Sequence, residues 1–113
     1  LVLDTLTNGD LFLLEEGELW RVPAPSTLVA EAQAAARDCA QAEPVLYAVP
    51  AGATDALPFL VEGYRALALT CIDRDQHAPR HYHHPTDTAA NADVDQLRRS
   101  TQIAWRLLER LAR

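Results

Sequence analysis

Three short apolar runs punctuate the chain, at residues 1–6, 45–49 and 66–72. Each run is too short for an average helix and is bounded by turn-forming residues, which is typical of β-strands. Strands that are apolar at successive positions are usually covered on both faces, as they are in parallel sheets flanked by helices. The pattern therefore predicts an α/β fold, with part of a mixed, largely parallel sheet covered by helices.

The segment between the first two runs predicts a β-hairpin near the N-terminus, followed by a helix. Residues 11–14 and 19–22 are largely apolar and flank the polar stretch 15–18, which is expected to form the turn. Prolines end the second hairpin strand, and Ser26 is placed to cap an alanine-rich helix that extends to about Ala42. A further proline is expected to stop this helix before the second apolar run.

The last part of the chain has the clearest helical pattern. Asp93 and Gln96 form a start that resembles a capping box. Six residues then recur at helical spacing: Val94, Leu97, Thr101, Ala104, Leu108 and Leu111. We predict a C-terminal amphipathic helix that packs on the sheet through this stripe. Four arginines lie off the stripe and are predicted to be solvated: Arg98, Arg99, Arg106 and Arg110.

Composition narrows the possible partners. The formal net charge is −6, so the basic face that nucleic-acid phosphates or anionic lipids require is not expected. No run approaches the roughly 20 apolar residues of a membrane span, so none is predicted. Cys39 and Cys71 fall in a predicted helix and a predicted strand, and we expect two buried thiols rather than a disulfide. These features leave the cellular compartment open.

Length and the absence of methionine set an expectation about the organisation of the protein. The 113 residues suffice for one domain at most and are fewer than most complete α/β enzymes have. Because the sequence contains no methionine, we expect a processed chain or a segment of a longer one.

Candidate chemistry lies at three places beside or after the apolar runs. Asp4 is a carboxylate within the first run, Thr54 and Asp55 lie in the loop after the second, and the loop at His81–Asp87 follows the third. Ligands of open α/β sheets bind outside the carboxyl ends of the strands, so these three places can converge on one edge. The alternative for Asp4 is a carboxylate that is satisfied as a turn or cap acceptor.

The polar loop at 73–92 contains all four histidines, three of them within RHYHHPTDT at 80–88. Loops of this length in compact domains are usually functional or disordered. A histidine cluster followed by a carboxylate is one form that metal sites take in sequence. His77, His81 and His84 are interpreted as solvated loop residues, whereas His83 has a distinctive spacing to Asp87.

The stretch YHHPTDT at 82–88 resembles the C-terminal metal-ligand motif of the di-zinc aminopeptidase family, often seen as Tyr-His-x-Pro-x-Asp-Thr. This family includes bacterial leucyl aminopeptidases, with glutamate carboxypeptidase II and glutaminyl cyclase as relatives. Residues 1–4 are similar to the family's apolar strand that ends in a zinc-binding aspartate. Residues 54–59 and 62–66 resemble its Ser-Asp-x-x-Pro-Phe and Gly-x-Pro-Ala segments. The motifs follow in the family's order over almost the entire chain.

The resemblance implies specific roles for five residues. Asp4 would bind one zinc ion and His83 the other. Tyr82 would hydrogen-bond the oxyanion of the tetrahedral intermediate. Asp55 and Asp87 would support the site by holding loops and ligands in orientation. The implied cofactor is a pair of zinc ions, and the implied substrate is a peptide or another amino-acyl compound.

Other characteristic residues of the family are missing from the chain. The family's bridging aspartate, its other histidine ligand and its adjacent glutamate pair all lie upstream of the strand that ends in Asp4. Residue 56 is alanine where many members have histidine, and residue 65 is arginine where proline is common. We therefore interpret residues 1–113 as the C-terminal part of a zinc exopeptidase catalytic domain, which needs the upstream half as its partner and is inactive alone.

Two alternative functions stay open at this point. The chain could belong to a non-catalytic relative that has lost its metals and serves as a protein-interaction scaffold. It could also be a stand-alone module that binds a metal through His81, His83 and His84, although adjacent side chains rarely point at one ion.

Overall fold

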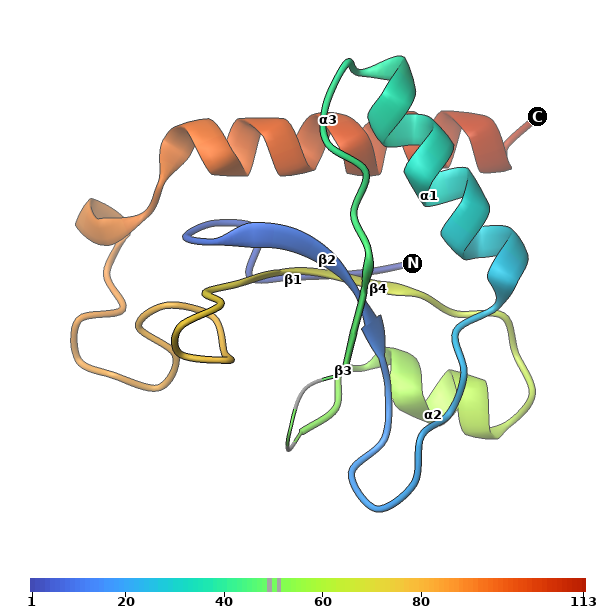
Figure 1. The fold of residues 1–113 in the computed structure, drawn as a ribbon, viewed down its shortest axis with the longest axis horizontal. Helices are drawn as coiled ribbons and strands as arrows, with labels where there is room; N and C mark the ends of the chain where they lie inside the picture. Colours follow the sequence, from blue (N-terminus) through green and yellow to red (C-terminus); the bar gives the residue numbers. More distant parts are fainter. Residues whose placement is uncertain (49, 51) are drawn as a thin grey trace.

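The computed structural model describes residues 1–48, 50 and 52–113, and their centre is a four-stranded mixed sheet (Figure 1). The strands are β1 (Val2–Asp4), β2 (Asp10–Glu15), β3 (Leu46–Ala48) and β4 (Ala68–Ile72). Their order across the sheet is β1-β4-β2-β3. β1 is parallel to β4 and β3 is parallel to β2, whereas β2 and β4 are antiparallel. The predicted α/β class and the mixed, largely parallel sheet are confirmed.

Helices cover the two faces of the sheet unequally. α1 (Ser26–Asp38) and α3 (Val94–Leu111) lie on one face, and the short α2 (Ala56–Val61) lies beyond the other (Figure 1). A 3₁₀ helix, Ala89–Asn91, precedes α3. The larger core cluster joins Leu13, Leu67 and Leu69 of the sheet region to apolar residues of α1 and α3. A smaller cluster around Leu14 and Ala56 lies on the α2 side.

Each of the three apolar runs contains a strand, but the three strands differ in how far they are buried. The run at 66–72 contains β4, in which all five residues are buried. The run at 45–49 contains β3, an edge strand whose first and last residues are exposed, so the expectation of a buried strand is wrong there. Residue 49 lies outside the described residues. The first run forms β1 at the opposite edge of the sheet, where Leu3 and Asp4 are exposed, so the expectation of a buried strand is wrong there too.

The predicted hairpin and the predicted start of α1 both need correction. After β2 the chain does reverse, but the pairing is a single antiparallel bridge between Glu16 and Val22 rather than a second full strand. The cap residue of α1 is Pro25, and Ser26 is the first helical residue with no side-chain cap hydrogen bond. The proline already has an extended backbone, so it takes the cap position that Ser26 was predicted to fill. The helix ends at Asp38, four residues earlier than predicted.

α3 begins as predicted but buries a different face. The Asp93 carboxylate accepts a hydrogen bond from the backbone N–H of Gln96 at 2.9 Å, which confirms the cap. The buried residues are Ser100, Ile103, Ala104 and Leu107, so only Ala104 of the predicted stripe lies in the core. Leu108 is 44% exposed, whereas its neighbour Leu107 is fully buried. α3 packs against α1 as well as the sheet, and this rotates its buried face away from the predicted stripe.

The start of α3 is also tied to the chain that follows β1. Asn8 Oδ1 accepts a hydrogen bond from the Asp93 N–H at 3.0 Å, and Thr7 Oγ1 donates to the Asp93 carbonyl oxygen at 2.9 Å. These two contacts join segments that are more than 80 residues apart in sequence. They fix the N-terminus of α3 over the carboxyl end of β1.

Two sequence-based expectations about thiols and membranes can be compared with the structure. Cys39 and Cys71 are both free thiols, but only Cys71 is buried as expected, whereas Cys39 is half-buried. Cys71 is buried in β4, and this burial raises the pKa of its thiol. Among the described residues, none of the helices is both long and apolar enough to cross a membrane.

Candidate active site

Asp4 lies at the carboxyl end of β1, where its side chain is exposed. Its register partner on β4 is Thr70. The next residue, Thr5, has a positive φ of 50°, and its hydroxyl donates to Asp4 Oδ1 at 3.0 Å. The Thr5 carbonyl oxygen in turn accepts from the Cys71 N–H at 2.9 Å, so the turn after β1 is anchored to the sheet. The carboxylate of Asp4 is therefore held at a fixed edge while remaining open to a ligand.

Asp73 organises the first part of the polar loop, immediately after β4. Its Oδ1 accepts hydrogen bonds from the N–H groups of Asp75 and Gln76, and its Oδ2 accepts from Arg80 Nε at 2.8 Å. Its own N–H donates to the Ala78 carbonyl oxygen at 2.9 Å. The hydrogen bond from Arg80 holds the pKa of the Asp73 carboxyl below its ordinary value. Sequence reasoning missed this residue, although an aspartate followed by a polar turn is a typical signal for such a loop.

Tyr82 and His83 follow as a stacked pair. Their rings lie 3.9 Å apart between centroids and are inclined by 20°. His83 has a φ of 58°, and His81 has a φ of 66°. His81 Nδ1 lies 2.8 Å from Thr86 Oγ1, so His81 helps to close the loop. Its expected role as a merely solvated residue is therefore incomplete.

A small cavity of about 90 Å³ brings three separate segments together. Asp4 lines it from β1, Thr54 from the loop before α2, and His77 and Tyr82 from the polar loop. The cavity therefore brings one residue from each of the three candidate places together: Asp4, Thr54 and Tyr82. His83 is placed beside it through its stack on Tyr82 and is not one of the lining residues described.

Asp55 and Asp87 lie at the margins of this arrangement. Asp55 is the cap residue of α2, without a side-chain cap hydrogen bond, and its side chain is exposed. Asp87 is also exposed, and its N–H donates to the His84 carbonyl oxygen at 3.0 Å within the loop. Over residues 1–48, 50 and 52–113, neither carboxylate forms a hydrogen bond or ion pair with Asp4 or His83.

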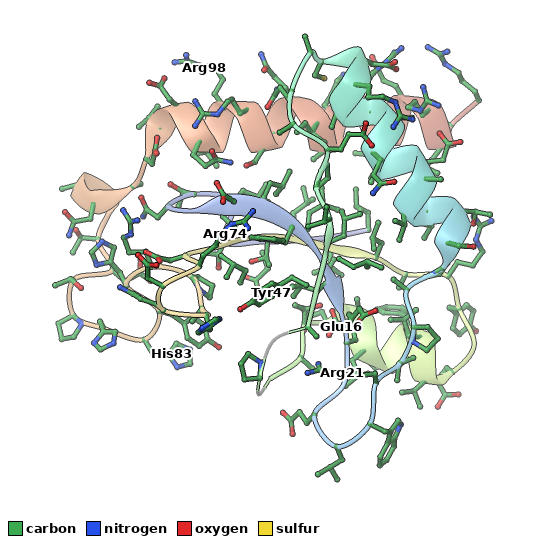
Figure 2. The ribbon with its side chains drawn as sticks, in the orientation of Figure 1. Glu16, Arg21, Tyr47, Arg74, His83 and Arg98 are labelled. Carbon is green, nitrogen blue, oxygen red and sulfur yellow. The ribbon has the colours of Figure 1, made fainter. Side chains whose placement is uncertain are left out.

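Glu16 is a site residue that sequence reasoning missed. It lies directly after β2, in the stretch expected to be a solvated turn, yet it is only 1% exposed (Figure 2). Its carboxylate accepts hydrogen bonds from both the N–H and the hydroxyl of Thr54, the former at 2.9 Å. Thr54 Oγ1 also accepts from the Ala56 N–H at 3.2 Å. Glu16 therefore holds the Thr54 loop against the cavity and against the start of α2.

The donors at the cavity are of the kind that zinc takes. Asp4 offers a carboxylate and His83 an imidazole, both common zinc ligands. Among the described residues, however, no group of three or more His, Cys, Asp or Glu side chains could hold a metal ion. Two ligands do not complete a tetrahedral site, so the described residues do not make a zinc centre by themselves.

Fold and site together define an α/β domain with potential metal ligands at the carboxyl end of β1 and in the loop that follows the adjacent strand, β4.

Comparison with protein families identifies the class of protein. The model of peptidase family M28 matches residues 7–108, and the chain belongs to this family. The match includes Asp55, Tyr82, His83 and Asp87 and begins just after Asp4. No curated protein matches the chain in a sequence comparison. The resemblance to di-zinc aminopeptidases is confirmed at the level of the family.

Proposed function

We propose that the chain is part of a zinc-dependent aminopeptidase that hydrolyses peptide bonds with a metal-activated water. The observation that carries the proposal is the convergence of Asp4, Thr54 and Tyr82 on one cavity, with His83 stacked beside it, in a member of peptidase family M28. These are the segments that would have to meet for the site to work.

Each candidate residue has a role that its position supports. Asp4 and His83 would hold zinc, which when bound lowers the pKa of a water molecule and polarises the scissile carbonyl. Tyr82 lines the cavity, so its hydroxyl can donate a hydrogen bond to the oxyanion as charge develops there. Asp55 and Asp87 would keep their loops in orientation once the complete site is assembled.

The proposal includes a partner, the upstream half of the same catalytic domain. Two protein ligands cannot complete a zinc site, and a general base has to come from elsewhere. The surface supports such a partner. β1 is an edge strand with Leu3 exposed, and α3 carries Val94 and Trp105 largely exposed. Exposed large apolar side chains and an unpaired strand edge are features that a partner can cover. The isolated chain is expected to be catalytically inactive.

The test is a histidine series in the full-length protein. His83→Ala should remove one zinc and most of the hydrolysis of an amino-acid p-nitroanilide, because only His83 has the ligand spacing. His81→Ala is the matched control, since His81 bonds Thr86 within the same loop and should retain zinc. Zinc is measured by elemental analysis alongside the assay. Equal losses in the two variants would show that loop structure, not ligation by His83, is what matters.

The upstream coding sequence separates this proposal from a non-catalytic scaffold. A co-catalytic zinc site needs a bridging carboxylate and a base, so a His-x-Asp-like motif and a Glu-Glu pair are expected within about 150 residues upstream, a distance set by ordinary domain size. An upstream region with neither motif would refute the enzyme and favour the scaffold.

A further inference from the structure

His77 is the one histidine of the loop that lines the cavity with Asp4 and Tyr82. It lies in the turn that Asp73 closes, between Gln76 and Ala78. Its φ is 54°, a left-handed conformation that costs a residue with a side chain about 1 kcal/mol or more. Sequence reasoning assigned His77 to solvent, but a strained residue held at the mouth of a site calls for a functional explanation.

A hydrogen bond from another element holds the His77 ring. The Tyr47 hydroxyl of β3 lies 2.9 Å from His77 Nδ1. Tyr47 is itself packed against Phe12, with ring centroids 4.9 Å apart. The guanidinium of Arg74 lies over the Phe12 ring, 5.1 Å from its centroid. Figure 2 shows Tyr47 on the side of the sheet from which it reaches the loop. The ring of His77 is therefore oriented by the sheet and not only by its own loop.

The chemistry of the pair decides which ring nitrogen carries the proton. A phenol is the stronger donor and a neutral imidazole nitrogen is the stronger acceptor, so the Tyr47 hydroxyl donates to Nδ1. In a neutral imidazole the other nitrogen then carries the hydrogen. Nε2–H is thus the ring group of His77 that Tyr47 does not engage, and it is a donor.

We propose that His77 contacts the substrate, donating a hydrogen bond from Nε2–H to a carbonyl oxygen of the bound peptide. Tyr47 is the positioning residue that fixes this tautomer and the ring's direction. The inference rests on the proposed function, because it takes the cavity of Asp4 and Tyr82 as the place where a peptide binds.

The first test follows the tautomer and ligand contact by NMR in the full-length protein labelled with ¹⁵N-histidine. Wild-type His77 should show the Nε2–H form. Addition of leucinamide, which offers one carbonyl and an amine, should produce a saturable shift at His77. Tyr47→Phe should lose the tautomer preference and weaken leucinamide binding about threefold, a fraction of one neutral hydrogen bond. An Nδ1–H form, or no saturable shift at His77, overturns the inference.

The second test separates substrate contact from loop structure by kinetics. His77→Ala should raise KM about tenfold with little change in kcat, the scale of one hydrogen bond made equally to substrate and transition state. His77→Gln keeps a donor of similar reach and should recover most of that loss. His84→Ala is the control, because His84 is exposed in the same loop and lies outside the cavity. Equal KM values in wild type and His77→Ala would overturn the inference.

The two proposals fail in different ways. A full-length protein that lacks peptidase activity, but whose His77 still shifts with leucinamide, would refute the aminopeptidase and keep the binding role. An active enzyme that binds zinc through His83, but whose His77 neither shifts with leucinamide nor affects KM, would support the aminopeptidase and refute the role of His77.

Discussion

At the scale of single residues, the carboxylates of Glu16 and Asp73 stabilise loops, whereas that of Asp4 is open to solvent. Glu16 and Asp73 are buried or nearly so and are fully engaged with backbone N–H groups and side chains of the loops they hold. Asp4 is exposed, and among the described residues its carboxylate accepts a hydrogen bond only from the hydroxyl of its neighbour Thr5. A carboxylate that is already saturated by donors has little capacity left for a metal ion. Of these three carboxylates, Asp4 therefore has the most capacity to bind a metal ion.

Replacing Glu16 should destabilise the chain more than replacing any exposed acid. Glu16→Ala leaves two donors of Thr54 without their acceptor, and loss of hydrogen bonds to a buried charged group costs roughly 2–3 kcal/mol. Glu18→Ala, at an exposed position two residues away, should change the free energy of unfolding by less than about 0.5 kcal/mol. Urea unfolding followed by tryptophan fluorescence measures both. A cost of the same size for the two variants would contradict the role of Glu16.

Tyr82 allows the proposed chemistry to be tested by removal of one oxygen atom. In the full-length protein, Tyr82→Phe should lower kcat by about 10²-fold, the scale of one oxyanion donor, while zinc content and KM stay nearly unchanged. The ring and its stack on His83 are preserved in this variant. A Phe variant with wild-type turnover would show that Tyr82 only packs the loop.

At the scale of elements, α3 has two apolar faces, and only one of them is in the core. Leu107→Ala removes a fully buried side chain and should cost about 2–5 kcal/mol of unfolding free energy. Leu108→Ala, on the neighbouring face, should cost less than about 1 kcal/mol in the isolated chain, because Leu108 is already largely in water. The pair is measured by thermal or urea unfolding. Reversed costs would mean that the helix packs through the predicted stripe instead.

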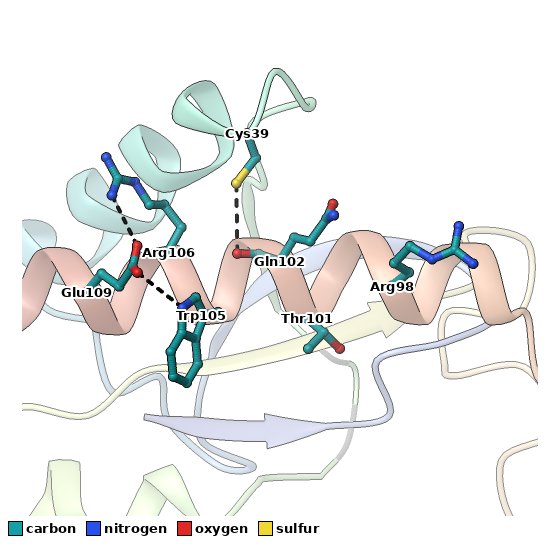
Figure 3. A pocket seen from close by; sticks show the side chains of 7 residues that line it. All are labelled: Cys39, Arg98, Thr101, Gln102, Trp105, Arg106 and Glu109. Carbon is teal, nitrogen blue, oxygen red and sulfur yellow. Dashed lines mark hydrogen bonds and ion pairs between the residues drawn. The ribbon is translucent and has the colours of Figure 1, made fainter.

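α1 and α3 are also joined by ion pairs. Asp38 accepts from Arg106 at 2.8 Å and from Arg110 at 3.0 Å, and Arg110 also reaches Glu31 at 2.7 Å. Arg106 further contacts Glu109, which accepts from Trp105 Nε1 as well (Figure 3). The prediction of a simply solvated face is therefore wrong for Arg106 and Arg110. The two arginines lower the pKa of Asp38, with the hydrogen bond from Arg106 as the leading cause.

This pKa shift predicts how stability depends on pH. Because the pKa of Asp38 is lower in the folded chain, its contribution is fully present above the unfolded value of about 3.9 and is lost as the pH falls through the folded value. Asp38→Asn should therefore be less stable than wild type at pH 7, and the gap should close as the pH is lowered towards 3. Asp95→Asn removes an exposed pair with Arg98 and is the control. A gap that does not depend on pH would contradict the ion-pair role.

At the scale of the whole molecule, the apolar runs and the closing helix sufficed to predict the class of fold, but not the order of strands. The runs at 45–49 and 66–72 look alike in composition, yet β3 is at an edge and β4 is inside. Strand order depends on contacts between distant segments, which a local pattern does not contain. The family could be predicted from its motifs, whereas the roles of Asp4, Tyr82 and His83 stay predictions. Glu16 contacts Thr54, 38 residues away, and Tyr47 contacts His77, 30 residues away. A local periodic pattern contains no information about contacts over such separations.

The exposed edge of β1 and the outer face of α3 lead to a prediction about the full-length protein. If the upstream half covers them, the amides of Val2–Asp4 should exchange more slowly with solvent there than in the isolated chain, and the fluorescence of Trp105 should shift to shorter wavelength. β4 is the internal reference, because it is buried in both cases. Hydrogen exchange with mass spectrometry makes the comparison. Equal exchange of β1 in the two proteins would contradict the proposed partner.

The ties between the first residues and the last helix have a consequence for synthesis. Val2 pairs with Ala68, and Asn8 bonds Asp93, so these two contacts cannot form until most of residues 1–113 have been made. At roughly 5–20 residues per second, Asn8 leaves the ribosome several seconds before Asp93 does. Until β4 has been made, the stretch at 1–6 lacks its pairing partner in the nascent chain. Translational pauses before residue 68 would lengthen this interval, so slow codons between β1 and β4 should lower the yield of folded protein more than slow codons within α3.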